Sequence, residues 1–392
     1  MYIKNCNIPI VKKKLFRCCT ADVSMGFIKE MIPYLKNRYE LRLLSSPGEN
    51  LSRLSEQFGL KAYGVQMERH ISPLKDIVSL FKLIRVFAVE RPDMVHSITP
   101  KAGLLCMMAA WITRVPVRIH TFTGLVWPTS SGMKRRLLML TDRLTCMCAS
   151  HIIPEGEGVM NDLKSYGITH KPMKVLGFGN IKGVDMARLS RERFIERSTE
   201  IKAEYGMNSS FSFLFVGRIV KDKGIEELVE AFDKLQKKCS NVKLLLIGRD
   251  DNDPISRTTR FLIESNADIL LLGPKFDDDL FAHYVASDCF VLPSYREGFP
   301  NAVMEAGALG LPSIVTDVNG SREIIIHGEN GLIVPSKNVS ALYNAMEQML
   351  VDKESTEYMV SKTRNLISSR FDNHYVQQCL YDYYSDVLND EA

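Results

Sequence analysis

Two glutamates that flank a loop-to-helix pattern are the most informative residues of this chain. Glu297 and Glu305 lie eight positions apart, with Gly298 and Pro300 between them. Glycine lets a backbone approach a ligand closely, and proline suits the first turn of a helix because its missing N–H is not needed there. We therefore expect a helix that begins at Pro300 and carries Glu305 about one turn inside it.

The start of that helix is a candidate anion site. N–H groups in the first turn of a helix have no carbonyl partner, and the helix dipole makes that end positive. The groups expected to point outward are those of Phe299, Asn301 and Ala302. A phosphate held by amides, beside carboxylates that accept hydrogen bonds from hydroxyls, is the combination that a nucleotide diphosphate sugar needs.

Two cations lie in a second loop that glycines enclose. Arg218 and Lys223 stand between Gly217 and Gly224, directly after the apolar run 211–216. A diphosphate gains negative charge as its bond to a sugar breaks, and two cations aimed at it stabilise the transition state without a metal. Arginine offers a two-pronged fork and lysine a point charge. Alone, the residues of both loops are equally explained as surface charges at helix ends.

Together, the two segments resemble the signature loops of the family 4 retaining glycosyltransferases. Residues 297–305 resemble that family's pair of glutamates eight positions apart, and residues 217–224 resemble its glycine-bracketed Arg and Lys loop, in the expected order. The resemblance covers most of residues 90–390 and the first 90 weakly. It implies the α/β fold named GT-B, in which two Rossmann-like doubly wound domains face each other across a cleft.

The resemblance also implies roles for the residues of both loops. Arg218 and Lys223 would hold the diphosphate, Glu305 the ribose hydroxyls, and Glu297 the sugar hydroxyls on the reacting face. The complete set of expected donor-binding residues is Gly217, Arg218, Lys223, Glu297, Gly298, Phe299, Pro300, Asn301 and Glu305.

One histidine of the first half is a further expected catalytic residue, beside Glu297, Arg218 and Lys223. His120 lies in the segment 117–124, after a predicted strand, where family members carry a histidine that faces the donor sugar. A structural histidine is the alternative interpretation of His120.

Three other residues are expected to bind the acceptor. His96 and Lys101 lie in the segment 96–103, which resembles a stretch of the family members that extend polyprenyl-diphosphate-linked sugars. The alternative interpretation is that His96 is an ordinary histidine at the end of a strand and Lys101 an ordinary lysine at the start of a helix. Gly26 lies in a loop where many members have two glycines, and this chain has one.

Alternation of strands and helices supports a fold of this class. Short apolar runs bounded by Gly and Pro are typical of buried parallel strands, and ligands bind at the carboxyl ends of such strands. The runs expected as strands are 15–18, 41–45, 93–96, 117–121, 151–154, 174–176, 211–216, 242–247, 269–272, 289–292, 313–315 and 332–334. The stretches expected as helices in the second half are 225–238, 278–286, 300–309 and 339–350.

A chain of 392 residues is long for one core and natural for two domains. The resemblance to GT-B proteins implies an acceptor-binding domain over 1–180, a nucleotide-sugar-binding domain over 181–372, and a helix over 373–392 that crosses back to the first domain. The hinge is expected at 177–185, which contains three glycines.

Charge is distributed unevenly between the two halves. Residues 1–185 hold 27 Lys and Arg against 14 Asp and Glu, whereas residues 186–392 hold 23 against 32. The basic half is expected to meet something anionic. No nucleic-acid-binding motif accompanies the charge. Residues 126–144 combine Trp127, a Leu/Met-rich stretch and the basic cluster 134–136. This pattern is typical of a helix that binds an anionic membrane surface, and an ordinary packed helix with a basic end is the alternative.

The sequence offers no sign of secretion or of a resident metal. No signal peptide is recognisable, and no apolar run reaches the roughly 18–20 residues that a membrane span needs. The nine cysteines lack metal-site spacing and are expected to be reduced and mostly buried. We expect no cofactor and no catalytic metal, because no Asp-x-Asp or His-Glu-x-x-His pattern stands at a plausible strand end.

The family resemblance, together with the uneven charge, implies a retaining hexosyltransferase that moves a hexose or N-acetylhexosamine from a nucleotide diphosphate sugar, by expectation a UDP-sugar, to a lipid-linked saccharide. It would act in surface polysaccharide synthesis as a cytoplasmic protein peripherally associated with the inner face of a bacterial membrane. Two alternatives remain: a nucleotide-sugar 2-epimerase of the same fold, and an inactive partner subunit.

Overall fold

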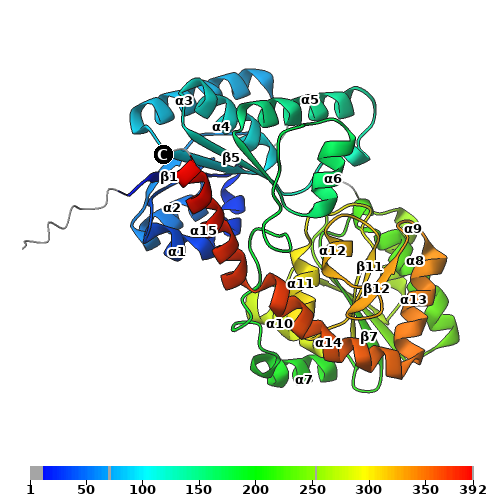
Figure 1. Ribbon diagram of the computed structural model, residues 1–392. Helices are drawn as coiled ribbons and strands as arrows, with labels where there is room; N and C mark the ends of the chain where they lie inside the picture. The colour runs from blue at the N-terminus through cyan, green and yellow to red at the C-terminus, as the bar shows by residue number, and fades with distance from the viewer. Residues whose placement is uncertain (1–11, 69–71, 252–253, 391–392) are drawn as a thin grey trace, which may run out of the picture. The chain divides into compact units, whose positions relative to one another are not determined.

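The computed structural model describes residues 12–68, 72–251 and 254–390, which form two units (Figure 1). Unit 1 contains the described residues up to 154 together with 160–174 and those from 377 onward, and unit 2 contains 155–159 and 175–376. Residues 175–180, expected in the first domain, lie in unit 2. There the backbone N–H of Asn180 donates to the carbonyl of Glu155 over 2.7 Å.

Unit 1 is built on a six-stranded parallel sheet in the order β3-β2-β1-β4-β5-β6. Its strands are β1 Lys14–Cys18, β2 Glu40–Ser45, β3 Lys61–Gly64, β4 Met94–Ile98, β5 Val117–Phe122 and β6 His151–Pro154. The side chains of β4 are buried throughout, as expected for a strand covered on both faces.

Helices cover both faces of this sheet. On one side α3 and α5 both pack against α4 (Figure 1). The helices are α1 Ile32–Lys36, α2 Glu49–Phe58, α3 Pro73–Glu90, α4 Pro100–Ile112, α5 Gly132–Cys148, α6 Glu157–Ser165 and α15 Asn373–Asp390; short 3₁₀ helices span Asp22–Phe27, Lys29–Met31 and Trp127–Thr129. From Gln377 onward, α15 belongs to unit 1.

Unit 2 repeats the same topology with the order β12-β11-β10-β7-β8-β9. Its strands are β7 Phe211–Val216, β8 Val242–Ile247, β9 Ile269–Gly273, β10 Cys289–Leu292, β11 Ser313–Thr316 and β12 Gly331–Val334. The helices are α7 Ile195–Glu204, α8 Ile225–Lys238, α9 Arg257–Ser265, α10 Asp277–Ala286, α11 Asn301–Ala308, α12 Ser321–Ile324, α13 Val339–Val351 and α14 Lys353–Phe371, with short 3₁₀ helices at Arg191–Phe194 and Lys221–Lys223.

Each sheet therefore has a topological switch point where the strand order reverses. It lies between β1 and β4 in unit 1 and between β7 and β10 in unit 2. Ligands of doubly wound sheets bind outside the carboxyl ends of the strands at such a point. The switch point of unit 2 is where the loops with the predicted donor-binding residues meet.

The predicted strands differ from the observed ones in two places. Strand β3 was not expected, because it is a half-exposed edge strand with a polar Lys61 and a terminal Gly64. Residues 174–176 were expected as a strand, yet only Met173 forms a single isolated bridge, to Ile152.

The eight cysteines among the described residues are all free, and most of them are buried. None of the described helices is both long and apolar enough to span a bilayer.

Candidate active site

The two glycine-containing loops of unit 2 meet at its switch point. The loop 217–224 follows β7 and the loop 294–300 follows β10, and these two strands are hydrogen-bonded neighbours. Gly224 has a φ of 71°, and a Cβ atom there would lie 2.1 Å from the carbonyl oxygen of Pro293. A side chain at position 224 would push the loops apart, so glycine is required for their contact.

An ion pair joins the central residues of these loops. The Lys223 Nζ donates to the Glu297 Oε1 over 2.5 Å, and the two side chains are only 16% and 11% exposed. The sequence predicted separate contacts for them, with the diphosphate and with the sugar. The structure brings the two side chains together at one point, where the charge-assisted hydrogen bond orients the lysine stem.

A second set of contacts reinforces the same junction. The Asp222 Oδ2 accepts from Arg296 over 3.1 Å, and the backbone carbonyl of Asp222 accepts from the N–H of Tyr295 over 2.9 Å. Sequence reasoning did not single out Asp222 or Arg296. The sequence indicated them only by position, because Asp222 directly precedes Lys223 and Arg296 directly precedes Glu297.

Arg218 is the more accessible of the two predicted cations. Its Nη1 donates to the Asp251 Oδ2 over 3.1 Å, its Nη2 lies 3.9 Å from the Asp222 Oδ1, and its side chain is 44% exposed. Carboxylates on both sides hold the guanidinium beside the junction, while its exposure leaves it able to meet a ligand.

The helix after the second loop begins one residue later than expected. Pro300 is the residue before α11, with extended backbone at φ −72° and ψ 108°, so its carbonyl accepts the N–H of Val303 over 3.1 Å. The N–H groups of Asn301 and Ala302 open the helix and have no carbonyl one turn earlier within it. Phe299 turns inward, and its ring packs on that of Phe371 at 5.4 Å.

Gly298 has a close backbone neighbour. A Cβ atom on Gly320, whose φ is 72°, would lie 2.0 Å from the Gly298 carbonyl oxygen. On another side, a Cβ on Gly179 would lie 2.8 Å from the ring of Phe299. The loop with Glu297 is therefore supported by two further backbone segments that only glycine allows to approach so closely.

Glu305 lies one turn inside α11, as predicted. The hydroxyl of Tyr284 donates to its Oε2 over 3.5 Å, and burial raises the pKa of the Glu305 carboxyl, with Lys182 and Arg188 opposing the increase. Lys182 was not predicted as a site residue. Its position is set by Asn180, whose side-chain oxygen accepts from the Lys182 N–H over 2.8 Å.

A buried carboxyl next to the turn at Gly179 and Asn180 was also not predicted from the sequence. Glu155 is 4% exposed, and burial, with the charge of Glu323 second, raises the pKa of its carboxyl to about 8. Glu323 accepts from the backbone N–H groups of Glu157 and Gly158 over 2.6 and 3.1 Å. Glu323 therefore holds the backbone at residues 157 and 158, and nothing in its sequence neighbourhood indicated this contact.

Two of the predicted acceptor-binding residues lie near the switch point of unit 1. Lys101 is in the first turn of α4, and its Nζ donates to the Asp76 Oδ2 of α3 over 2.5 Å. The loops after β1 and β4 are tied by the Thr20 and Thr99 hydroxyls, 2.7 Å apart. Gly26 lies in the 3₁₀ helix Asp22–Phe27, where an added Cβ would meet nothing within 4 Å.

His96 is part of the core of unit 1 rather than an exposed strand end. Its Nδ1 accepts from Arg17 over 2.6 Å, so its Nε2 carries the proton and donates to Thr121 over 2.7 Å. Tyr384 of α15 contacts the same Nδ1 at 2.5 Å. Burial, with Arg17 adding to it, holds the pKa of His96 well below its usual value. His96 lies within β4 rather than at its end, and the predicted contact with an acceptor gains no support from this environment.

His120 lies inside β5, within the range 117–121 that was predicted as a strand. Its side chain is 1% exposed, and its Nδ1 is 2.9 Å from the Ser97 hydroxyl. A Cβ on Gly103 of α4 would lie 2.4 Å from its ring, which shows how closely the helix covers it. Burial lowers the pKa of His120 to about 3. The predicted contact with a donor sugar gains no support from this position.

Trp127 does not lie at an interface with solvent. The side chain is fully buried, and its Nε1 donates to the Asp142 Oδ2 over 3.0 Å. Burial raises the pKa of Asp142 to about 7, with the Trp127 hydrogen bond opposing the increase. The indole is therefore a packing element beneath α5. Other members of the pattern in residues 126–144 do lie at the surface, namely Met133 at 76% exposure, Leu137 at 38%, Leu140 at 50%, and the basic residues Lys134 and Arg136.

Comparison with known proteins agrees with this geometry. Residues 197–366 match the family described as glycosyl transferases group 1, and residues 27–179 match the glycosyl transferase 4-like domain. The capsular polysaccharide biosynthesis glycosyltransferase CapM of Staphylococcus aureus is 31% identical, covering 96% of this chain and 98% of CapM. The Escherichia coli UDP-Gal:alpha-D-GlcNAc-diphosphoundecaprenol alpha-1,3-galactosyltransferase is 27% identical, covering 82% of each chain.

A solved structure extends the comparison to the fold. The crystal structure of Anabaena HepE in complex with UDP and glucose matches with a TM-score of 0.78 at 17% identity, covering 95% of this chain and 99% of HepE. The topology of both units, the paired loops of unit 2 and the similarity to CapM over nearly the whole chain lead to one conclusion: the chain belongs to the group 1 glycosyltransferases and has their GT-B fold.

Proposed function

We propose that this glycosyltransferase moves a hexose or N-acetylhexosamine from a UDP-sugar to a lipid-linked saccharide, with retention of the anomeric configuration. The observation that carries the proposal is the Lys223–Glu297 pair, which joins the two signature loops at the switch point of unit 2. A cation for a leaving diphosphate and a carboxylate for sugar hydroxyls then lie side by side.

The residues of unit 2 account for the negative charge that develops on the leaving group. As the bond between the anomeric carbon and the diphosphate breaks, Arg218 and Lys223 stabilise the negative charge on the leaving oxygen. The first N–H groups of α11 add to this stabilisation, and Glu305 accepts from the ribose hydroxyls. The acceptor oxygen forms the new bond on the same face of the sugar, and its proton passes to the leaving phosphate.

This route requires no general base from the protein. Glu297 is held in an ion pair with Lys223, which suits it to orienting hydroxyls rather than to removing a proton. We propose that the reaction also needs no metal ion, since two fixed cations supply the charge.

The nature of both substrates is supported by the relatives. The name of the E. coli enzyme specifies a UDP-sugar donor and a saccharide on diphosphoundecaprenol, and CapM is named for capsular polysaccharide biosynthesis. HepE was crystallised with UDP and glucose. The excess of basic residues in the first half of this chain suits a diphosphate-linked acceptor. We infer that the enzyme acts on the inner face of the cell membrane in surface polysaccharide synthesis.

Two other functions are less well supported. A nucleotide-sugar 2-epimerase would need a carboxylate or histidine free to remove a carbon-bound proton. In unit 2 Glu297 is paired with Lys223, and in unit 1 His96 and His120 are buried. An inactive partner subunit would not need Arg218, Lys223 and Glu305, all of which are present.

The direct test is transfer of labelled sugar from a panel of UDP- and GDP-sugars to a detergent-solubilised polyprenyl-diphosphate monosaccharide, with and without EDTA. One UDP-sugar should give a longer lipid-linked product at equal rates in both conditions, and nuclear magnetic resonance should show a retained configuration. A product that requires a divalent metal would refute the metal-free mechanism. Interconversion of free nucleotide sugars would establish the epimerase.

A further inference from the structure

Helix α3 of unit 1 carries apolar side chains on both of its faces. Its inner face packs Leu83 and Phe87 into the core, where Phe87 meets the ring of Phe16 at 5.4 Å. Its outer face exposes further apolar side chains, which we call the outer stripe. These are Leu74 at 81% exposure, Ile77 at 51%, Val78 at 55%, Phe81 at 67% and Val89 at 72%.

The outer stripe has helical periodicity. Leu74, Ile77, Val78 and Phe81 follow one another at intervals that place them on a single side of the helix. From Leu74 to Val89 the stripe extends about 22 Å along the helix axis. Contiguous exposed apolar side chains of this extent on a folded domain mark a surface that binds another molecule or a membrane. We therefore expect another molecule to cover the outer side of α3.

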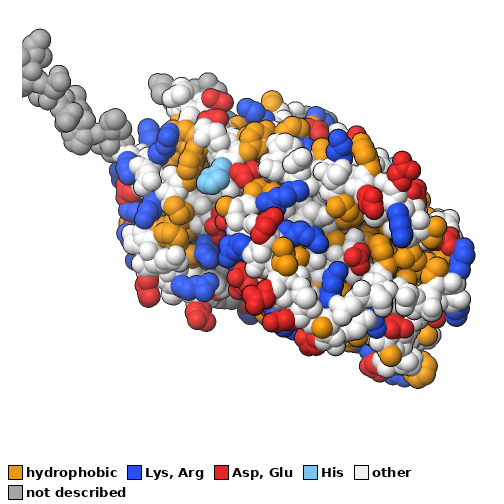
Figure 2. Space-filling model, turned by 90° about the horizontal axis from the view of Figure 1, so that it is seen from below, with side chains coloured by type: hydrophobic (Ala, Val, Ile, Leu, Met, Phe, Trp, Pro, Cys, Tyr) orange, Lys and Arg blue, Asp and Glu red, His pale blue; other side chains and the backbone are white. Residues whose placement is uncertain are grey.

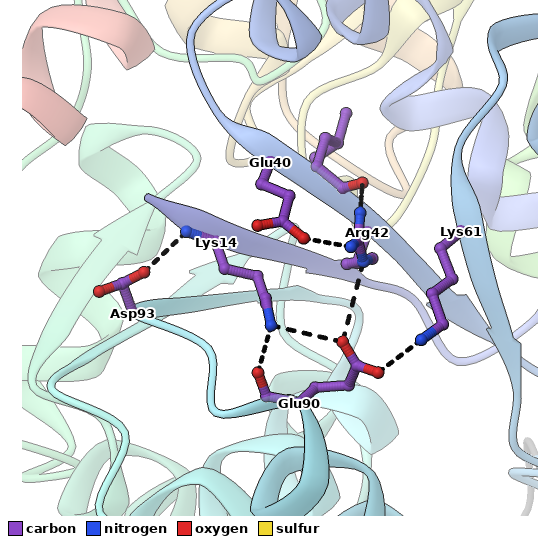
Figure 3. Close-up of polar contacts among 7 residues, drawn as sticks. Lys14, Glu40, Arg42, Lys61, Glu90 and Asp93 are labelled. Atoms are coloured by element: carbon purple, nitrogen blue, oxygen red, sulfur yellow. Dashed lines mark hydrogen bonds and ion pairs between the residues drawn. The ribbon is translucent and has the colours of Figure 1, made fainter. Parts of the chain in front are cut away.

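The orientation of α3 is fixed at its C-terminal end. Glu90, its last residue, lies in a cluster of cations from the sheet (Figure 3), with its Oε1 2.6 Å from the Lys61 Nζ. The Lys14 Nζ lies 3.5 Å from Oε2 and donates to the Glu90 carbonyl over 2.5 Å. Hydrogen bonds from Lys61 and then Tyr63 lower the pKa of Glu90 to about 2.

The N-terminal end is fixed as well, through the ion pair between Asp76 and Lys101. With both ends tied to the rest of unit 1, the helix cannot rotate to turn its outer stripe inward.

The charges beside the outer stripe are positive. Lys82 and Arg85 are exposed on the same side of α3, and across the described residues neither has a carboxylate within ion-pair distance. Both acids of the helix, Asp76 and Glu90, are already paired with lysines. By contrast, the face shown in Figure 2 has acidic and basic side chains interspersed. Exposed apolar residues beside uncompensated cations are complementary to an anionic lipid surface.

A groove continues this surface between the ends of α3 and α4. It has a volume of about 600 Å³ and is lined by Ile84, Ala88 and Ile112, with Arg91 and Arg114 also among its lining residues. Trp111 of α4, next to Ile112, is 56% exposed. The lining is mixed, since Asp93 and Thr113 also belong to it, and its apolar side chains and two arginines suit an acyl chain joined to a phosphate.

We infer that the outer stripe of α3 is a docking surface for an anionic lipid bilayer, with the helix axis parallel to the membrane. The inference rests on the proposed lipid-linked acceptor. Because α3 runs antiparallel to the strands, its first turn lies toward the carboxyl ends of β1 and β4. Lys101 joins α4 to that turn through Asp76. Docking there brings the lipid surface next to the expected acceptor residues of unit 1.

The test compares binding of the full-length chain to vesicles of phosphatidylglycerol and to vesicles of phosphatidylcholine. The wild type should sediment with the anionic vesicles, and added salt should weaken the binding. The double variant Leu74→Ser/Phe81→Ser should lose roughly tenfold or more in partitioning, as expected for two exposed apolar side chains that no longer enter the lipid. The control Phe261→Ser removes a side chain of α9 that is also 67% exposed and should bind as the wild type does.

Two further measurements separate this inference from the proposed function. Transfer to a short-chain, detergent-free acceptor should be equal in the wild type and the double variant. If no protein transfers sugar while the wild type still binds vesicles, the proposed function fails and the docking surface stands. Unchanged vesicle binding by the double variant would overturn the inference. So would a wild-type dimer that the double variant loses, because a second copy would then cover the stripe.

Discussion

At the scale of single residues, the central feature is that Lys223 and Glu297 neutralise each other in a largely buried pair. A buried pair of this kind is costly to break from one side, because the remaining charge loses its partner. A bound diphosphate would share the ammonium with the carboxylate, so the pair keeps the lysine in place before a donor arrives.

Replacing Lys223 with alanine should reduce transfer strongly. Loss of one charge-stabilising donor typically raises the barrier by about 2.7–4 kcal/mol, which corresponds to roughly 10²–10³-fold in kcat. The matched control is Lys221→Ala, which removes an exposed lysine of the same loop and should leave kcat nearly unchanged. Steady-state kinetics of both variants, with circular dichroism to confirm folding, make the comparison. Equal rates for Lys223→Ala and the wild type would remove the diphosphate role.

Replacing Glu305 with glutamine should weaken binding of UDP. A hydrogen bond to a charged group contributes about 1.5–3 kcal/mol, so the dissociation constant should rise roughly 10- to 100-fold. Because burial raises the pKa of Glu305, the wild type should also lose affinity as the pH falls, beginning above the range in which an ordinary glutamate titrates. Isothermal titration calorimetry measures both effects. The control is Glu264→Gln on α9, an exposed site, and an unchanged affinity in Glu305→Gln would refute the ribose contact.

At the scale of elements, sequence patterns predicted the parts of the fold that are locally encoded. The bounds of β7, β8, β10 and α8 match those expected, because apolar runs between glycines and prolines define buried strands without reference to the rest of the chain. The edge strand β3 escaped because its residues are half exposed and carry no such run.

The environments of the two histidines could not be predicted in the same way, although both lie in strands that were predicted. His96 is buried by partners at positions 17, 121 and 384, so its environment depends on pairings that are distant in sequence. His120 is covered by α4 at Gly103, a contact that no local pattern announces. The pairing of Lys223 with Glu297 was also beyond local reasoning, since it joins loops 74 positions apart.

The contact between the two signature loops should depend on Gly224. In Gly224→Ala, the new methyl group would meet the Pro293 carbonyl, and the left-handed backbone adds about 1–2 kcal/mol of strain. Gly206→Ala is the control, because Gly206 has a similar φ of 62° while its Cβ would meet only a lysine side chain at 4.0 Å. Thermal unfolding should show a larger loss for Gly224→Ala, with weaker UDP binding. Equal losses would indicate that strain alone matters.

The buried histidine of β5 should make stability depend on pH. Because the folded pKa of His120 is about 3, the unfolded chain binds a proton below about pH 6.5 that the folded chain does not. The free energy of unfolding should therefore fall by about 1.4 kcal/mol per pH unit between pH 6.5 and 3, with His96 acting in the same direction. The free energy of unfolding can be measured by urea denaturation at several pH values across this range. Its change with pH should be smaller in His120→Gln and unchanged in His170→Gln, an exposed control. Parallel slopes in all three proteins would contradict the assignment.

At the scale of the whole molecule, two units with the same topology carry different chemistry at equivalent places. The switch point of unit 2 gathers Arg218, Lys223, Glu297 and the start of α11, whereas the residues at the switch point of unit 1 are hydroxyls and the paired Lys101. The charged residues that the proposed function assigns to the leaving diphosphate thus lie in unit 2. Unit 1 contributes the basic excess and the outer stripe of α3.

The central claim is that the donor bond is broken for transfer to an acceptor. The most direct measurement is the rate of UDP release from a UDP-sugar with and without the lipid-linked acceptor, in the wild type and in Lys223→Ala. We predict release that depends on the acceptor and falls roughly 10²–10³-fold in the variant. Release at the same rate without acceptor, or equal rates in the two proteins, would contradict the account.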